Sequence, residues 1–240
     1  MPESGCRQLA NVFNRRFAHH RRMTVGKTFV SRTIRAHQYD IQVLRQKIKH
    51  RPPRPVAPHL IWGMDLTGKR DAQRNTHPLL GIVEHHSRAN LELRALQDKT
   101  TVTVLRSLLD AIERFGRPTI IRTDNEASFT SLLFRFGLFL LGVRHQRIDP
   151  GRPWQNGRVE RFFGTLKDKL NQWEVSCLGE LNGALHEFRF WYNHVRTHQY
   201  LDGRTPAEVW DGVDIYIKRA KKEYWFEAWD GLLTGFYLRH

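Results

Sequence analysis

A run of closely spaced prolines divides this chain into two parts. Four of them fall within seven residues: Pro52, Pro53, Pro55 and Pro58. Proline lacks a backbone N–H and fixes φ, so this run excludes a helix interior or a central strand and favours a stiff, extended spacer. We therefore predict a linker at residues 49–58, with a short helical region before it and a longer region of strands and helices after it.

Residues 1–48 have the pattern of a small DNA-binding region. Apolar residues recur at helical spacing across 7–20, and a break containing Gly26 separates this helix from a second one over 27–37. Two short helices around a tight turn are typical of a helix-turn-helix. The alternative is a charged helical hairpin that only packs on the rest. A third helix is expected over 41–49. The candidate DNA contacts on the second helix are Lys27, Thr28, Ser31 and Arg32.

The pattern after the linker predicts an α/β domain over residues 59–210. Strands are expected at 60–67, 79–83, 90–96, 119–122 and 143–148, and helices at 101–115, 129–141, 155–170 and 181–194. Three strands in succession, followed by alternating helices and strands, describe an α/β sandwich around one mixed sheet. Residues 211–240 form a basic, aromatic tail, which we expect to pack onto the core.

The charge and composition of the chain indicate which class of partner it binds. With 39 Lys and Arg against 24 Asp and Glu, the formal charge is +15, which favours a polyanion such as nucleic acid. Cys6 and Cys177 are too few and too far apart for a disulfide framework or a cysteine-built zinc site. No apolar run reaches the ~18 residues of a membrane span, and the N-terminus lacks a secretory pattern. We expect a cytoplasmic protein with no membrane partner.

Three acidic residues stand where a folded domain does not need them. Asp65 lies near the end of the first strand, on the same face as Gly63, and Asp124 ends a short, apolar strand. Glu160 borders the buried stripe of a helix, and Lys167 lies two turns further on the same side. Each acid also has a structural alternative. The alternatives are a turn residue for Asp65, a helix cap for Asp124 and a surface ion pair for Glu160.

Three carboxylates around one point repel one another unless a cation neutralises them. Oxygen-only ligands select Mg²⁺ or Mn²⁺, and two such ions promote in-line phosphoryl displacement. The catalytic and metal-ligand candidates are therefore Asp65, Asp124 and Glu160. The candidate DNA contacts around them are Lys167, Arg158, Arg161 and Asn156.

The motifs resemble the integrase core shared by retroviral integrases and many insertion-sequence transposases. Asp124 and Glu160 have 35 residues between them (positions 125–159), the separation that marks that superfamily. The resemblance spans 59–210 without a gap. The matching segments are Trp62–Thr67, Thr123–Glu126, Pro153–Lys167 and Trp191–His194, with Arg196, His198, Leu201, Gly203, Thr205, Pro206 and Glu208.

The resemblance implies an RNase H-like fold, with a mixed five-stranded sheet flanked by helices. It implies a transposase that uses two Mg²⁺ ions, replaceable by Mn²⁺, to cleave double-stranded DNA at element ends and join it to target DNA. Asp65 would bridge the two ions, while Asp124 and Glu160 each complete one. A homodimer or higher oligomer on DNA is expected. The alternatives are a catalytically silent or truncated DNA-binding derivative, and a metal-dependent nuclease on the same fold.

Some positions depart from the family pattern. Thr197 stands where many relatives have proline, and Glu84 stands where the strand often carries Asp. The His and Cys zinc domain of retroviral integrases is absent. His194 and His198 are spaced to share a metal ion, but without an obvious third ligand we favour a structural or DNA-contacting pair.

Overall fold

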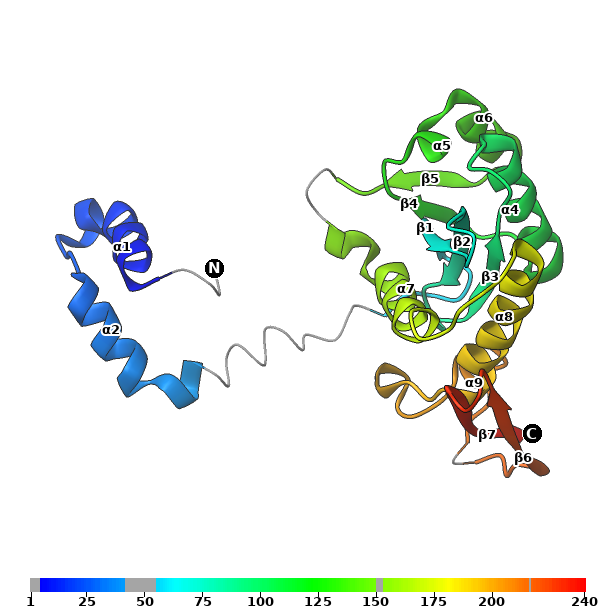
Figure 1. Cartoon of the computed structure of the whole chain (residues 1–240). Helices are drawn as coiled ribbons and strands as arrows, with labels where there is room; N and C mark the ends of the chain where they lie inside the picture. The colour runs from blue at the N-terminus through cyan, green and yellow to red at the C-terminus, as the bar shows by residue number, and fades with distance from the viewer. Residues whose placement is uncertain (1–4, 42–54, 150–152, 216) are drawn as a thin grey trace. The chain divides into compact units, whose positions relative to one another are not determined.

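The computed structural model describes residues 5–41, 55–149, 153–215 and 217–240. It divides into two compact units, 1–54 and 55–240 (Figure 1). The predicted helix over 41–49 and most of the predicted linker lie outside the described residues. Among the residues it describes, no helix is long and apolar enough to cross a membrane.

The first unit contains the two predicted short helices. They are α1 (Cys6–Arg21) and α2 (Lys27–Ala36). The turn between them is held by Asn14, which accepts a hydrogen bond from Val25 N at 2.7 Å and donates one to Val25 O at 3.1 Å. Val30, Ser31 and Ile34 are the half-buried residues of α2.

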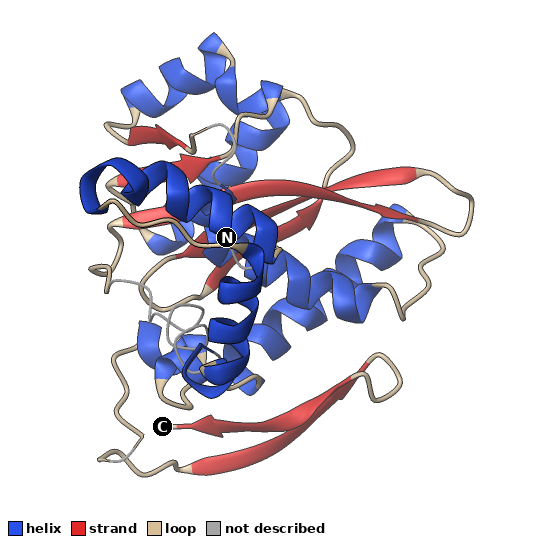
Figure 2. Ribbon diagram, turned by 90° about the vertical axis from the view of Figure 1, so that its left-hand side faces the viewer, coloured by secondary structure: helices blue, strands red, loops and turns tan. Residues whose placement is uncertain are grey.

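The second unit is built on the predicted mixed five-stranded sheet (Figure 2). Its strands are β1 (Ile61–Arg70), β2 (Thr76–Glu84), β3 (Asn90–Ala95), β4 (Ile120–Thr123) and β5 (Arg144–Arg147). The order is β3-β2-β1-β4-β5. The first three strands are antiparallel, whereas β4 pairs in parallel with β1 and with β5. The short β4 therefore lies inside the sheet, which explains why its residues are so apolar.

Helices cover both faces of this sheet. They are α4 (Thr101–Phe115), α5 (Ala127–Thr130), α6 (Leu132–Leu140), α7 (Gly157–Leu170), α8 (Leu178–Phe190) and α9 (Pro206–Trp210). Short helical turns are η1 (Pro153–Asn156), η2 (Trp191–Val195) and η3 (Gln199–Leu201). Trp62 and Met64 of β1 pack with α4 and α6, while Leu79 and Val83 of β2 pack with α7 and α8. The alternation of β1 thus places Gly63 and Asp65 toward α7.

Two predicted helices differ from the observed ones. The expected single helix over 129–141 is broken at Ser131, whose extended backbone (ψ 150°) ends α5 and whose hydroxyl caps α6 by accepting from Phe134 N. Serine competes for backbone hydrogen bonds in this way, so it favours a cap over a helix interior. The expected helix over 155–170 begins in η1 and becomes α-helical only at Gly157.

The aromatic tail forms a hairpin of β6 (Lys222–Ala228) and β7 (Leu233–Arg239). At its turn, Trp229 stacks on Trp173 with ring centroids 5.6 Å apart and also contacts Phe188. The indole N–H of Trp191 donates to Thr234 O at 3.1 Å. The tail therefore packs onto the core beside α7 and α8, as its aromatic residues led us to expect.

Candidate active site

The two aspartates lie on adjacent parallel strands. Gly63 of β1 is in register with Arg122 of β4, and Asp65 and Asp124 each follow two residues later on the same face. Local hydrogen bonds orient both carboxylates, because Asp65 Oδ1 accepts from Leu66 N at 2.8 Å and Asp124 Oδ1 accepts from Glu126 N at 3.0 Å. Two acids distant in sequence thus come together where β4 ends. Asp65 lies in the middle of β1 rather than near its end as predicted, because pairing with β2 extends this strand to Arg70.

Glu160 reaches the same place from the first turn of α7. This helix packs against β1 and β2, where the Val159 side chain lies over Gly63 and Phe163 lies over Gly81. The absence of side chains at both glycines lets the helix approach the sheet closely. Glu160 itself is exposed, and its negative charge acts on Asp65.

The electrostatics of the site centre on Asp65. Burial, reinforced by the negative charges of Asp124 and Glu160, raises the pKa of Asp65 to about 7. Burial also raises the pKa of Glu160. A carboxyl group whose ionisation is opposed by its neighbours is one whose ionised form a bound cation would stabilise.

The chemistry of these donors fits a hard divalent cation. All are carboxylate oxygens, the ligands that Mg²⁺ and Mn²⁺ prefer. In the described part of the chain, no three His, Cys, Asp or Glu side chains converge closely enough to hold a metal ion as they stand. Asp124 and Glu160 act on Asp65 electrostatically, but the three carboxylates do not form a ready-made metal site.

Comparisons with known proteins cover the segment that holds these acids. Two family models, both described as integrase core domain, match residues 55–153 and 141–206. Residues 55–206 form an integrase core domain. The family predicted from the sequence is thereby confirmed.

Relatives of this integrase core occur in bacterial insertion elements and retroviruses. An uncharacterized 39.2 kDa protein of insertion element IS476 from Xanthomonas euvesicatoria is 27% identical over 181 residues, covering 71% of this chain and 52% of that protein. A 31.7 kDa protein of insertion element IS407 from Burkholderia multivorans is 26% identical, covering 64% and 56%. The Gag-Pro-Pol polyprotein of bovine leukemia virus is 34% identical over 119 residues, covering 50% of this chain and 8% of the polyprotein. The chain thus spans about half the length of the insertion-element relatives.

Solved structures show the same fold. The HTLV-2 integrase catalytic core domain in complex with magnesium superimposes with a TM-score of 0.55 at 24% identity, covering 65% of this chain and 99% of that chain. The simian T-cell lymphotropic virus intasome in complex with a PP2A regulatory subunit gives a TM-score of 0.59 at 23% identity, covering 78% and 69%. The integrase core described here is therefore RNase H-like.

Glu126 is an acid near the site whose role the sequence did not reveal. In the sequence it appears only at the end of the matching segment Thr123–Glu126, but its charge contributes to raising the pKa of Asp65. Its Oε1 also pairs with Lys99 Nζ at 3.0 Å. Its position two residues after Asp124, just beyond the strand end, was the signal that could have identified it.

Arg122 of β4 forms hydrogen bonds with two other segments near the site. Its Nη1 donates to Gln155 O at 2.9 Å, and its Nη2 and Nε donate to Gln146 Oε1 at 2.9 and 3.1 Å. One side chain from β4 thus holds both the edge strand β5 and the turn that leads into α7. This arrangement fixes the start of the helix that carries Glu160.

The predicted DNA contacts differ in exposure. Lys167 and Arg161 are exposed on α7, and Arg158 is half-buried. Asn156 is only 1% exposed and its side chain lies over Gly63, which leaves it no surface for a direct DNA contact. On α2, three of the four candidates are exposed and Ser31 is half-buried; the exposed ones are Lys27, Thr28 and Arg32.

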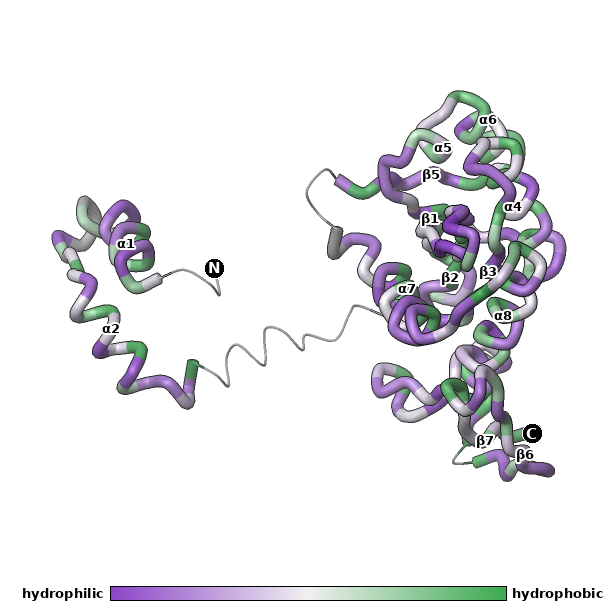
Figure 3. The backbone as a smooth tube through the Cα atoms, viewed as in Figure 1, coloured by the Kyte–Doolittle hydropathy of each residue, from purple (hydrophilic) through white to green (hydrophobic). Residues whose placement is uncertain are grey.

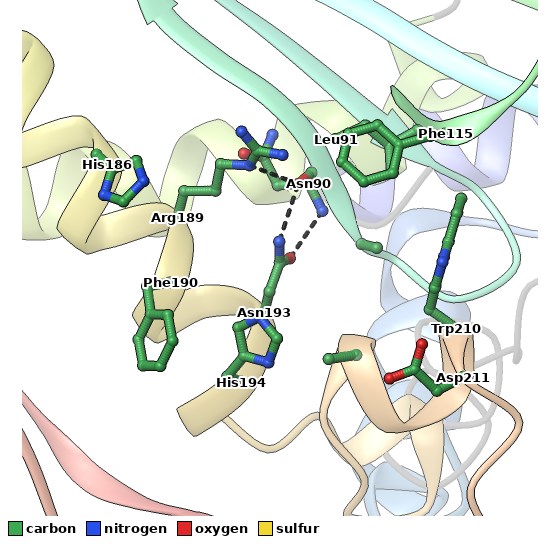
Figure 4. A pocket seen from close by; sticks show the side chains of 12 residues that line it. Asn90, Leu91, Phe115, His186, Arg189, Phe190, Asn193, His194, Trp210 and Asp211 are labelled. Carbon is green, nitrogen blue, oxygen red and sulfur yellow. Dashed lines mark hydrogen bonds between the residues drawn. The ribbon is translucent and has the colours of Figure 1, made fainter. Parts of the chain in front are cut away.

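The motif Trp191–His194 lies away from the three acids, and its Asn193 joins η2 to β3 by hydrogen bonds. Asn193 Nδ2 and Arg189 Nε both donate to Asn90 O, at 2.9 and 3.1 Å, and Asn90 N donates to Asn193 Oδ1 at 2.9 Å (Figure 4). These bonds join η2 and α8 to β3 beside a pocket of about 400 Å³. His194 packs on Phe190 and His198 on Tyr192, so the two imidazoles have separate aromatic partners.

Proposed function

We propose that this chain is a transposase of the DDE type, which cleaves DNA at the ends of an insertion sequence and joins it to target DNA. The observation that carries the proposal is the coupling of Asp65 to Asp124 and Glu160 at one edge of an integrase core. The similarity to proteins of two insertion elements supports it, and so does the +15 charge of the chain. The partner is double-stranded DNA, contacted by α2 and by the basic residues of α7.

In this proposal each acid has a distinct position relative to a pair of Mg²⁺ or Mn²⁺ ions. Asp65, on which both other acids act, would be the ligand shared by the pair, while Asp124 and Glu160 would each hold one ion. The chemistry that such a pair supplies is activation of the attacking oxygen and stabilisation of the leaving oxygen. Lys167, two turns along α7 from Glu160, holds a phosphate of the DNA strand near the site.

A nicking assay tests the catalytic assignment. Wild type and Glu160→Gln are compared for Mn²⁺-dependent nicking of supercoiled plasmid, with Glu113→Gln as the matched control because Glu113 is exposed on α4, away from the site. We expect nicking to be lost in Glu160→Gln and retained in the control, with DNA binding unchanged in both. Equal nicking by all three proteins would remove Glu160 from the site.

The two alternatives give different products. If the protein is a DNA-binding derivative without activity, neither the wild type nor any variant will nick DNA, even DNA that carries the element ends. A simple nuclease would nick but would not join a labelled 3′-OH end to a second DNA. Recovery of the labelled joined product distinguishes a transposase from both.

We also propose that the protein acts as a homodimer or higher oligomer on DNA. The support is a large apolar surface on α6, where five side chains are between 49% and 81% exposed: Leu132, Leu133, Phe136, Phe139 and Leu140. Hydrophobic residues run along this helix in Figure 3, and the adjoining α4 exposes Val102 and Leu109. Gathered, exposed apolar side chains of this kind mark protein interfaces. A second copy of the chain is a suitable occupant because joining two DNA ends requires two active sites.

A further inference from the structure

A second group of basic side chains lies on the side of α7 away from Glu160. Successive helical residues turn by about 100°, so Glu160 falls on one border of the buried stripe and Arg158 on the other, with Arg161 beyond Arg158. The electrostatic partners agree with this division. Glu160 acts on Asp65, whereas Arg158 and Arg161 each interact with Arg88, a residue outside the helix.

Arg88 lies in the turn between β2 and β3, which has a firm internal structure. The Glu84 carboxylate accepts hydrogen bonds from Ser87 N at 2.6 Å, Ser87 Oγ at 2.7 Å and His86 N at 2.9 Å. Arg88 itself adopts a left-handed backbone with φ of 66°. Non-glycine residues adopt this conformation uncommonly, so the structure of the turn fixes the backbone from which the Arg88 side chain extends.

The charges of Arg88 and its neighbours on α7 act on one another. Burial, and then the positive charge of Arg88, lowers the pKa of Arg158 to about 10. Burial also lowers the pKa of Arg88, and the charge of Arg161 adds to the effect. Glu84 acts on both Arg88 and Arg158, and its carboxylate also accepts the hydrogen bonds of its own turn.

Of the three arginines, Arg161 stacks on an aromatic ring, and the neighbouring Arg196 does the same. The guanidinium of Arg161 lies 5.0 Å from the centre of the Tyr200 ring, and that of Arg196 lies 5.7 Å from the centre of the Tyr192 ring. Stacking on a ring holds a guanidinium plane while leaving its N–H groups directed outward along its edge. His85, buried beside the group, adds no charge of its own, since burial and the nearby arginines lower its pKa to about 2.

We propose that Arg88, Arg158 and Arg161 bind a backbone phosphate of duplex DNA on the side of α7 away from Glu160. A phosphate presents several oxygens to the planar N–H donors of guanidinium groups, and its negative charge is attracted to all three arginines. The phosphate is not the one that is cleaved, because the carboxylates lie on the other border of the helix. This inference rests on the proposed function for its ligand, and it gives α7 two DNA-contacting sides.

The test is DNA binding by the full chain in EDTA, so that catalysis plays no part. A fluorescent duplex of arbitrary sequence is titrated with wild type, Arg88→Gln and Arg161→Gln over a range of salt concentrations. The matched control is Arg106→Gln, on the exposed side of α4. Each phosphate contact contributes about one to the slope of log K against log salt. We therefore expect each cluster variant to lower that slope by about one and to bind DNA several-fold more weakly at low salt.

The outcomes separate this site from the catalytic proposal. Glu160→Gln should bind DNA in EDTA as wild type does, so a failure of nicking leaves the present result intact. Arg161→Gln removes an exposed side chain and is the variant to read if Arg88→Gln lowers the melting temperature. Cluster variants with the slope and affinity of Arg106→Gln would overturn the proposal. So would loss of inorganic phosphate binding without any change in DNA binding, which would identify a site for free anions only.

Discussion

Gly63 of β1 lies so close beneath Val159 of α7 that a methyl group at position 63 would overlap the Val159 side chain. It would also meet the His85 ring and the Asn156 side chain. The helix therefore rests on the strand at a distance that only glycine permits. Because Glu160 follows Val159 directly, this close contact is what brings the helical acid beside Asp65.

Gly63→Ala should disturb both stability and activity. The added methyl group forces α7 away from β1, and such overpacking of a core costs about 1–3 kcal/mol. Displacing the helix also moves Glu160, so we expect the nicking rate to fall even at temperatures where the variant is fully folded. Calorimetric melting and the Mn²⁺ nicking assay measure the two effects. A melting temperature and a nicking rate equal to those of wild type would show that the contact between Gly63 and Val159 is not tight.

Gly164→Ala should have the opposite effect on stability. Gly164 lies inside the same helix, one turn after Glu160, and a Cβ there meets no atom within 4 Å. Alanine in a helix interior is more favourable than glycine by roughly 0.5–1 kcal/mol, so the melting temperature should rise. A lower melting temperature would mean that the open space beside Gly164 is not available in solution.

Asp65→Asn should make stability less dependent on pH. The pKa of Asp65 is raised from 3.8 to about 7, so its contribution to stability is fully present below pH 3.8 and is lost as the pH rises through 7. At pH 8 in EDTA the variant should therefore be more stable than wild type by about 1–3 kcal/mol, and the difference should shrink toward pH 4. Melting curves across this range check the prediction, and parallel curves for the two proteins would contradict it.

The same variant predicts a response to divalent cations. Mg²⁺ or Mn²⁺ that binds the folded state should raise the melting temperature of wild type at pH 8, because binding to the native state stabilises it. Asp65→Asn should lose most of that increase. In wild type the increase should weaken below pH 7, where protons compete for Asp65.

Phe139→Glu should separate the oligomer into monomers. Phe139 is 76% exposed on α6, and a buried carboxylate in a self-interface carries a large desolvation cost. Phe236→Glu on β7 is the matched control, because Phe236 is 57% exposed outside the α6 surface. Light scattering after size exclusion, with and without DNA, reports the mass. A dimer that persists in Phe139→Glu would place the interface elsewhere.

Much of this domain could be predicted from local pattern. Alternation in β1 placed Asp65 opposite Trp62 and Met64, the spacing of apolar residues located α4, and the glycine and proline that follow it marked its end. These features depend on periodicity, turn residues and burial, which neighbouring residues determine. The motif spacing further indicated which strand ends and which helix carry the acids.

Other features depended on contacts between distant segments. Glu126 affects the pKa of Asp65 because β1 and β4 are adjacent strands. Asn156 is buried because α7 packs closely against Gly63. The break at Ser131 and the meeting of Arg88 with Arg158 likewise follow from packing. The sequence by itself determined which elements form and which residues carry charge. The tertiary structure decided which charges face one another, because electrostatic and steric effects act through space, over distances that the order of residues does not record.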